Sequence, residues 1–372
     1  TMVFSSAADS LTFSGNFGTG FISLGLGADT VAFQGSVLTG TTLTGLSESG
    51  DRASLLGTSA VVFGGDGIAS GAQVSFGANA DQATFSGTVG AASIYGGAGA
   101  DTFRFEAAVA SATIDAGADA DSLYFGAAVS GVTLTGDGAD TFSLQGTNTV
   151  AFGALTTAAT QVSFGANADM ATFTGAVGAG SIYGGGGADT LVFSNIGLTG
   201  TTLSGGAGAD LFSGSVTIGN SGVSFWGGAD ADTFNFSSFT GAGSGTAYFW
   251  NEGGQDSIVF NSVVSGGSGA SGNAAGVFFG ITSGSGLAIS FLDAQTSASF
   301  GTGVSNLFRV NNNLVSFGIN SNNYITLSFV GGGTVQLQGF DSDEARAITN
   351  TFGTAGGGTA LFGTAASIPT FS

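Results

Sequence analysis

Hydrophobic and polar residues alternate in short runs along most of the chain, and the runs recur at a regular interval. In the run that follows Asp101, the second and fourth residues are Phe103 and Phe105, with polar residues between them. Another apolar residue, Ile94, lies seven positions before the same aspartate. A period of two is typical of a strand that turns one face to the interior. The pattern therefore predicts two short strands for each interval.

The interval itself is about 20 residues, which is the length expected for one coil of a solenoid. A longer block also repeats, because residues 73–97 return with few changes as residues 161–185. Stacked coils bury their apolar positions as internal ladders and satisfy the backbone of each coil through its neighbours. We therefore predict an all-β, parallel β-solenoid. The aspartates that mark the interval are Asp29, Asp51, Asp81, Asp101, Asp121, Asp140, Asp169, Asp189, Asp210, Asp232 and Asp256.

The repeat fades after Phe260, and this change predicts three regions. Residues 1–260 form the solenoid, and residues 261–286 form a Gly/Ser-rich connection. Residues 287–372 form a C-terminal β-rich cap domain with strand-like runs, a hairpin turn at residues 330–334 and one or two helical turns within 341–350. We expect this last region to hold a secretion or assembly signal.

Composition narrows the possible functions. The chain has 24 acidic and 4 basic residues, a formal net charge of −20, and no His or Cys. All four basic residues are arginines, so nucleic acid and anionic membranes are not expected partners. The common nucleophilic triads, thiolates, Schiff-base lysines and zinc ligand sets are missing. No apolar run is long enough for a transmembrane segment. We expect a protein that is not an enzyme, although carboxylates alone can serve a glycosidase.

The interval ends in a six-residue loop, and three copies of this loop read Gly-Gly-x-Gly-x-Asp: residues 96–101, 184–189 and 205–210. The fourth position is Gly, Asn or Asp in the other copies, which are residue types that tolerate positive φ. We expect backbone geometry to select this position. The residues that we take as candidate metal ligands or ligand-shaping positions are Gly97, Gly99, Asp101, Asp119, Asp121, Gly136, Gly138, Asp140, Gly185, Gly187, Asp189, Gly206, Gly208, Asp210, Asp230 and Asp232.

This loop followed by an apolar residue resembles the RTX repeat of calcium-binding β-rolls, in particular that of secreted and S-layer proteins, over roughly residues 20–260. The resemblance implies Ca²⁺ held by loop carbonyls and aspartate carboxylates between successive coils. The chain departs from the family because its Asp loop comes once per coil, so we expect calcium on one edge. Stacked carboxylates about 4.8 Å apart also repel each other and need a counter-ion, whatever the family. The alternative is that each aspartate merely forms an Asx turn.

Three functions remain open at this point. The first is a secreted, self-assembling structural protein, such as an S-layer, filament or matrix subunit, which would be extracellular or at the cell surface and exported through a C-terminal (type I) signal. Its partners would be other copies of itself, calcium and a cell-surface polysaccharide. The second is an adhesin or a solenoid that binds ice or a glycan through outward Thr and Ser residues. The third is a carbohydrate-active β-helix enzyme.

Overall fold

The protein is an all-β parallel solenoid with about 20 residues per coil. The computed structural model describes residues 1–35, 38–155 and 159–241. Beyond residue 241 it describes 246–251, 255–260, 263–264, 276–281, 286–291, 314–319, 325–329 and 334–338. No helix occurs among these described residues. The chain forms two compact units, Thr1–Ala176 and Val177–Ser372, and each is considered by itself.

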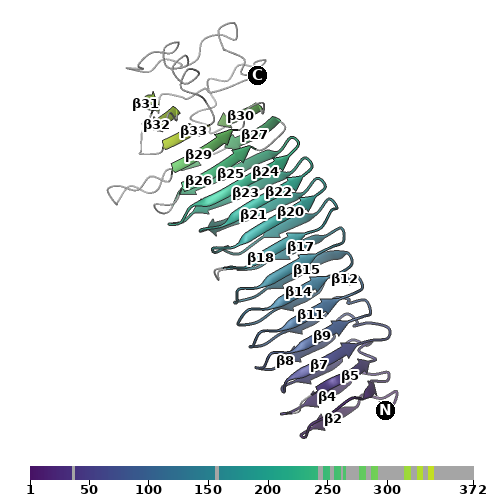
Figure 1. The fold of residues 1–372 in the computed structure, drawn as a ribbon. Coiled ribbons are helices and arrows are strands. Elements are labelled where there is room, and N and C mark those ends of the chain that lie inside the picture. Colours follow the sequence, from purple (N-terminus) through teal and green to yellow (C-terminus); the bar gives the residue numbers. More distant parts are fainter. Residues whose placement is uncertain are drawn as a thin grey trace. The chain divides into compact units, whose positions relative to one another are not determined.

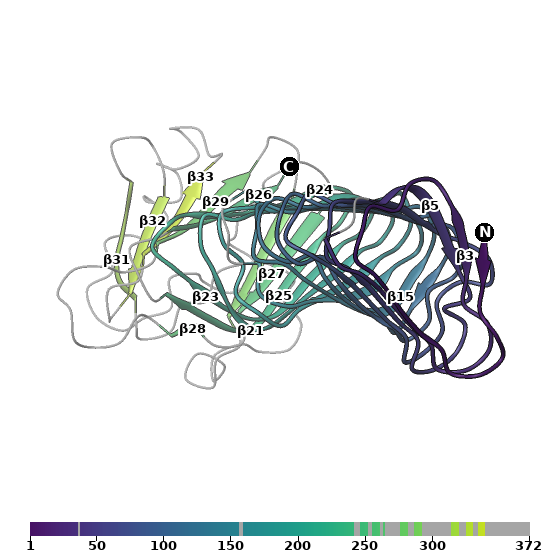
Figure 2. The same cartoon turned by 90° about the horizontal axis from the view of Figure 1, so that it is seen from below.

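In the first unit, strands alternate between two parallel sheets, which we call sheet A and sheet B (Figure 1). Figure 2 shows the coils of this unit one behind another. Each strand pairs in register with the strand one coil away, as Thr102–Phe105 does with Ser122–Phe125. Sheet A holds β1 (Met2–Val3), β3 (Phe21–Ser23), β5 (Leu38–Thr44), β7 (Ser59–Phe63), β9 (Gln82–Phe85), β11 (Thr102–Phe105), β14 (Ser122–Phe125), β16 (Thr141–Leu144) and β18 (Gln161–Phe164). Sheet B holds β2 (Ser10–Phe13), β4 (Thr30–Phe33), β6 (Arg52–Leu55), β8 (Gln73–Phe76), β10 (Ser93–Tyr95), β13 (Thr113–Asp115), β15 (Val129–Thr135), β17 (Thr149–Phe152) and β19 (Met170–Phe173), and β12 (Val109–Ala110) pairs with β15.

The second unit repeats the arrangement with longer strands. Within this unit, sheet A holds β20 (Ser181–Gly186), β22 (Thr202–Ala207), β24 (Val223–Ala229), β26 (Thr246–Asn251) and β29 (Gly276–Ile281). Sheet B has β21 (Thr190–Leu198), β23 (Leu211–Ile218), β25 (Thr233–Gly241), β27 (Gln255–Phe260) and β30 (Gly286–Phe291), with β28 (Val263–Val264) on β25. β33 (Thr334–Gln338) pairs in parallel with β29 and antiparallel with β32 (Ile325–Phe329), which pairs antiparallel with β31 (Leu314–Ile319).

The parallel pairing therefore extends past residue 260, since β29 and β30 add to β26 and β27. β29 lies within the stretch 261–286, which we expected to be a connection. The antiparallel pairing of β32 and β33 agrees with a hairpin about residues 330–334. The helical turns expected within 341–350 lie outside the described residues. The division at residues 260 and 286 stays a prediction.

The interior is built from columns of apolar side chains, as the alternation predicts. Phe85, Phe105 and Phe125 lie on successive coils with nearly parallel rings, and their centroids are 4.5 Å and 4.7 Å apart. Phe63 extends this column by a further stacked ring at 4.8 Å. Two rings of the column also make edge contacts, Phe63 with Phe76 of the facing sheet and Phe85 with Phe103 of its own sheet. Offset-stacked and edge-to-face contacts are the arrangements that aromatic pairs prefer.

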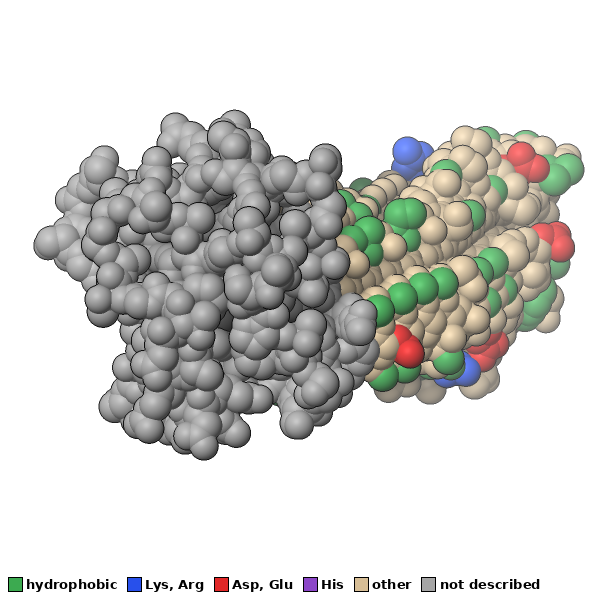
Figure 3. Space-filling model, turned by 90° about the horizontal axis from the view of Figure 1, so that it is seen from above, with side chains coloured by type: hydrophobic (Ala, Val, Ile, Leu, Met, Phe, Trp, Pro, Cys, Tyr) green, Lys and Arg blue, Asp and Glu red, His purple; other side chains and the backbone are tan. Residues whose placement is uncertain are grey.

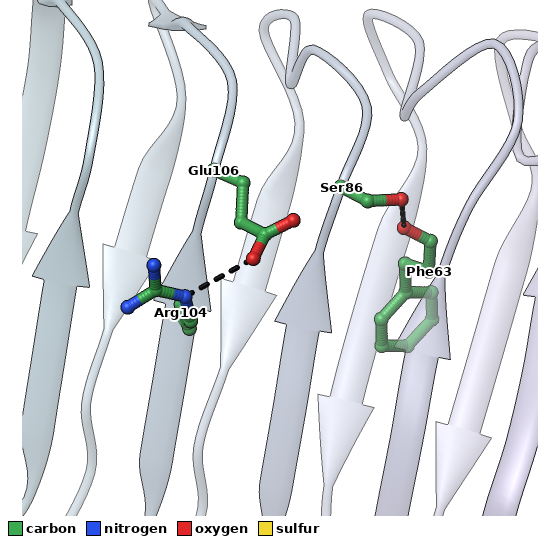
Figure 4. A network of polar contacts seen from close by, with 4 residues as sticks. All are labelled: Phe63, Ser86, Arg104 and Glu106. Atoms are coloured by element: carbon green, nitrogen blue, oxygen red, sulfur yellow. Dashed lines mark hydrogen bonds and ion pairs between the residues drawn. The ribbon is translucent and has the colours of Figure 1, made fainter.

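The outer faces carry few charges. Figure 3 shows hydrophobic side chains in single file among uncharged ones, with scattered acidic and basic groups. Arg104 forms an ion pair with Glu106 at 3.1 Å (Figure 4). It also lies over the ring of Tyr124. Ser86 donates a hydrogen bond to the carbonyl oxygen of Phe63, one coil earlier. The described part of the chain contains no helix, and so it has no helix that could cross a membrane.

We expect Phe105→Ala to destabilise the protein by about 3–5 kcal/mol, because it removes a fully buried ring between two stacked neighbours. The midpoint of urea unfolding, followed by the circular dichroism of the β-sheet, measures this loss. The control is Thr84→Ala on the outward side of the neighbouring strand, which should change stability by no more than about 0.5 kcal/mol. Equal effects of the two substitutions would contradict the inward column.

Candidate cation-binding loops

The loop aspartates form a hydrogen-bonded ladder that runs from coil to coil. The backbone N–H of Asp81 donates to Oδ1 of Asp101 at 2.7 Å, and Asp101 donates in the same way to Asp121 at 2.8 Å. Asp121 donates to Asp140 at 3.0 Å. The same bond joins Asp9 to Asp29 to Asp51 and, in the second unit, Asp189 to Asp210 to Asp232. These aspartates are buried, apart from Asp9, so one carboxylate oxygen of each rung has a structural partner in the neighbouring coil.

The second oxygen is the unusual feature of the ladder. Six Oδ2 atoms are buried and have no hydrogen-bond partner among the described residues: those of Asp29, Asp81, Asp101, Asp121, Asp140 and Asp210. Leaving a buried polar group unpaired costs about 1–3 kcal/mol, and more when the group is charged. Asp51 provides a contrast, because its Oδ2 accepts a hydrogen bond from the backbone N–H of Glu48 at 2.9 Å.

Carbonyl oxygens of the next coil share the space beside these carboxylates. A methyl group added to Gly96 would lie 3.0 Å from Oδ2 of Asp101 and would overlap the carbonyl oxygen of Ala116. A methyl group added to Gly205 would overlap Oδ2 of Asp210 and lie 2.7 Å from the carbonyl oxygen of Gly227. Two acceptors therefore lie close together beside the first loop position in these two loops, where a side chain would not fit. Oxygens brought together in this way can share a proton or a cation.

Five loops share one backbone conformation, with positive φ at both the second and the fourth position. They are residues 96–101, 116–121, 184–189, 205–210 and 227–232. Of the candidate positions, Gly97, Gly99, Asp119, Gly185, Gly187, Gly206, Gly208 and Asp230 all have positive φ. Backbone geometry therefore selects the fourth position in these loops, as predicted. Asp119 also accepts a hydrogen bond from the N–H of Gly99 at 3.0 Å.

The same expectation is wrong for three other loops, those that end at Asp81, Asp140 and Asp169. Gly136 and Gly138, which belong to the loop that ends at Asp140, do not have positive φ, and neither do Asn79 and Asn167. The two asparagines instead donate from their side-chain amides to carbonyl oxygens about one coil earlier, those of Leu56 and Gln145 respectively. A side-chain hydrogen bond to the neighbouring coil, rather than backbone conformation, accounts for the asparagine in these two loops.

Within residues 1–176 the Asp loops lie on two edges of the solenoid, so the single edge expected from the sequence is wrong there. Asp29 and Asp51 lie in loops that lead from sheet A to sheet B, since they precede β4 and β6. Asp81 and Asp101 lie in loops that lead from sheet B to sheet A, since they precede β9 and β11. Asp169 precedes β19, so its loop lies on the first edge again.

The two changes of edge have a signal in the sequence. Asp51 and Asp81 are 30 residues apart, and Asp140 and Asp169 are 29 apart, which is one and a half coils instead of one. Each new column starts with a neutral residue. Ser59 donates its backbone N–H to Oδ1 of Asp81, and Asn148 donates its backbone N–H to Oδ1 of Asp169.

Asn148 shows what can occupy the position of the second carboxylate oxygen. Its Oδ1 accepts from the N–H of Val129, as an aspartate Oδ1 does in the ladder. Its Nδ2 donates to the carbonyl oxygen of Gly146 and to Oδ1 of Asp169. A hydrogen-bond donor at this place is therefore satisfied by the surrounding oxygens. An aspartate brings a further acceptor to the same surroundings.

The burial of the aspartates has a direct electrostatic consequence. Desolvation raises the pKa of Asp101 and of Asp121 to about 7, although a ladder hydrogen bond to each opposes the shift. Neighbouring carboxylates, Asp119 among them, raise both values further. Burial likewise raises the pKa of Asp81 and of Asp210 to about 6, and it raises the pKa of Asp140 and Asp169. Without a counter-ion, these carboxyl groups hold protons more strongly in the folded than in the unfolded chain.

The donor set fits a hard cation with few charged ligands. Among the described residues, no group of three or more acidic side chains is placed to hold a metal ion. Any cation in these loops would therefore be bound by one or two carboxylates together with backbone carbonyl oxygens. Oxygen-only ligands favour Ca²⁺ over the transition metals. No family model matches the chain, and no curated protein is similar enough to count as a relative.

We expect the metal-free protein to become less stable as the pH rises from about 5 to 8. The raised pKa values mean that the folded state binds more protons, so this contribution is complete below the unfolded value near 3.8 and is lost as the pH passes 6–7. Each pKa unit corresponds to about 1.4 kcal/mol per group. Unfolding midpoints measured in chelator across this range test the prediction. The control variant Asp101→Asn should show a shallower slope, and stability that rises toward pH 8 would contradict the raised pKa values.

Proposed function

We propose that the protein is a self-assembling structural solenoid whose loops are stabilised by calcium. The observation that carries the calcium part is the set of buried Oδ2 atoms that have no donor and converge with carbonyl oxygens of the next coil. A divalent cation between these oxygens would replace several bound protons and would remove the repulsion between stacked carboxylates.

The sites proposed as most favourable are those between two loops of the shared conformation. One is the space between the loops that end at Asp101 and Asp121. The others lie between the loops that end at Asp189, Asp210 and Asp232. Calcium there would supply positive charge, while the protein supplies carboxylate and carbonyl oxygens. The resemblance to RTX repeats supports this assignment.

The structural role is supported by the regularity of the coils and by outer faces that carry few charges. Such a protein would fold and assemble outside the cell, where calcium is plentiful, and the resemblance to RTX proteins suggests export through a C-terminal signal. Outward Thr and Ser residues interrupted by Gln73, Tyr95, Arg104, Asp115 and Met170 do not form a uniform hydroxyl array. This irregularity favours assembly over ice binding.

We expect calcium to raise the unfolding midpoint of the protein at pH 7.5 and chelator to lower it. The stabilisation should reach about 2.7 kcal/mol for each site when free calcium is 100 times its dissociation constant. Asp101→Asn should reduce this gain, because it removes one of the carboxylate oxygens proposed to bind the cation. The matched control is Asp51→Asn, since the second oxygen of Asp51 already has the N–H of Glu48 as its donor.

Each variant is compared with and without calcium, so a change in its basal stability does not affect the result. If Asp101→Asn and the unaltered chain gain equal stability from calcium, the loop ending at Asp101 is not a ligand. If calcium adds no stability to any of the proteins, the calcium assignment is wrong.

We expect electron microscopy of the purified protein to show regular filaments or sheets with calcium and dispersed particles in chelator. The physical reason is that stacked carboxylates without a counter-ion repel each other and destabilise the coils. The outer faces of these coils form the proposed contacts between copies. Binding assays of the same sample with soluble glycans and with ice serve as the comparison. Monodisperse particles in calcium that bind one of those ligands would favour the adhesin alternative.

A further inference from the structure

Charged side chains are confined to the loops of one edge in residues 177–241. The four charged residues of this segment are Asp189, Asp210, Asp230 and Asp232. All four lie in loops that lead from a strand of sheet A to a strand of sheet B, between β20 and β21, β22 and β23, or β24 and β25. The outward positions of both sheets in this segment therefore carry no charge.

One of these uncharged faces has aromatic residues at its centre. Tyr183, Ser204 and Trp226 occupy equivalent positions on β20, β22 and β24, as the strand register shows. The side chain of Tyr183 is 44% exposed, and Trp226 is partly exposed. Hydroxyl-bearing residues lie beside them at the next outward position, Ser181, Thr202 and Ser224. We call Tyr183, Ser204 and Trp226 the aromatic column.

The aromatic column contains Trp226, which is one of the two tryptophans of the chain. The register of β24 with β26 pairs Trp226 with the other tryptophan, Trp250. Elsewhere in the described residues the large rings are mostly inward, as at Phe225, which precedes Trp226 and is fully buried. Tyr and Trp are enriched, and Lys, Glu and Asp are depleted, in the cores of protein–protein interfaces.

The charge of the protein indicates which partner fits this face. Two copies of a chain with a net charge of −20 repel each other wherever their acidic edges approach. They can meet without that cost where no charge is present, and the aromatic column supplies an apolar centre for such a contact. We propose that the outer face of sheet A in residues 181–229 is an assembly interface on which a second copy of the chain docks through the aromatic column.

This inference rests on the proposed self-assembly and can be tested separately from it. Trp250→Phe leaves Trp226 as the only tryptophan, so its fluorescence reports on this face alone. As the concentration of this variant rises through the assembly threshold, we expect its emission to shift to shorter wavelength and acrylamide quenching to fall on the order of twofold, because docking excludes water from the interface core. Assembly with unchanged quenching of Trp226 overturns the docking proposal.

Substitutions provide the second arm of the experiment. Trp226→Thr should raise the concentration needed for assembly by about tenfold or more, as loss of a central aromatic does at other interfaces. Trp226→Phe should retain most of the assembly. The matched control is Tyr95→Ser, since Tyr95 is an exposed tyrosine of the first unit, 38% exposed, and should leave the threshold unchanged.

Circular dichroism of each variant shows whether its sheets are intact. If the unaltered chain does not assemble at all, the proposed function fails. If it assembles while Trp226→Thr is folded and has the same threshold, only the docking face is wrong. Protection of Trp226 by a neutral oligosaccharide in a protein that stays monomeric also overturns the docking proposal, in favour of a ligand surface.

Discussion

Each coil of this protein rests on a near-copy of itself at the spacing of hydrogen-bonded strands, about 4.8 Å. Every position is therefore stacked on its own equivalent, and a side chain is favourable only if it packs against itself. Phenylalanine satisfies this condition, as the parallel rings of Phe85, Phe105 and Phe125 show. Threonine on the outer faces satisfies it as well. A buried carboxylate does not, and the loops of the solenoid are arranged around that conflict.

The ladder resolves half of the conflict. One oxygen of each aspartate accepts the N–H of the preceding aspartate, so a backbone donor that would be unpaired at the loop is satisfied by the next coil. At Asp101 and Asp210 the other oxygen lies near a carbonyl oxygen of the next coil and has no donor among the described residues. Burial raises the pKa of Asp101 and Asp121 to about 7, so the folded chain holds protons at these carboxyl groups more strongly than the unfolded chain does. The same aspartates are thus needed by the fold and unfavourable within it.

The half-coil shifts limit how many carboxylates stack on one another. Residues 1–176 hold separate columns on two edges, and Ser59 and Asn148 begin the columns that follow each shift. Asp51, at the end of the first column, has its second oxygen satisfied within its own loop. A solenoid with two equivalent edges permits this change, because an extra half coil keeps the strand pairing and moves only the loop. The sheets remain continuous within the unit while the charge changes edge.

The sequence by itself determined the strand alternation, the coil length and the inward side chains, because each depends on a local period of two or on the repeat. It also identified the aspartates and glycines of the loops. The tertiary structure decided the edge on which each loop lies, since that depends on which sheet the next strand joins. It decided too that Oδ1 of Asp101 accepts a hydrogen bond from the neighbouring coil, while Oδ2 has no partner among the described residues. The spacings of 29 and 30 residues could have revealed the change of edge. No local pattern could have revealed the position of a single carboxylate oxygen.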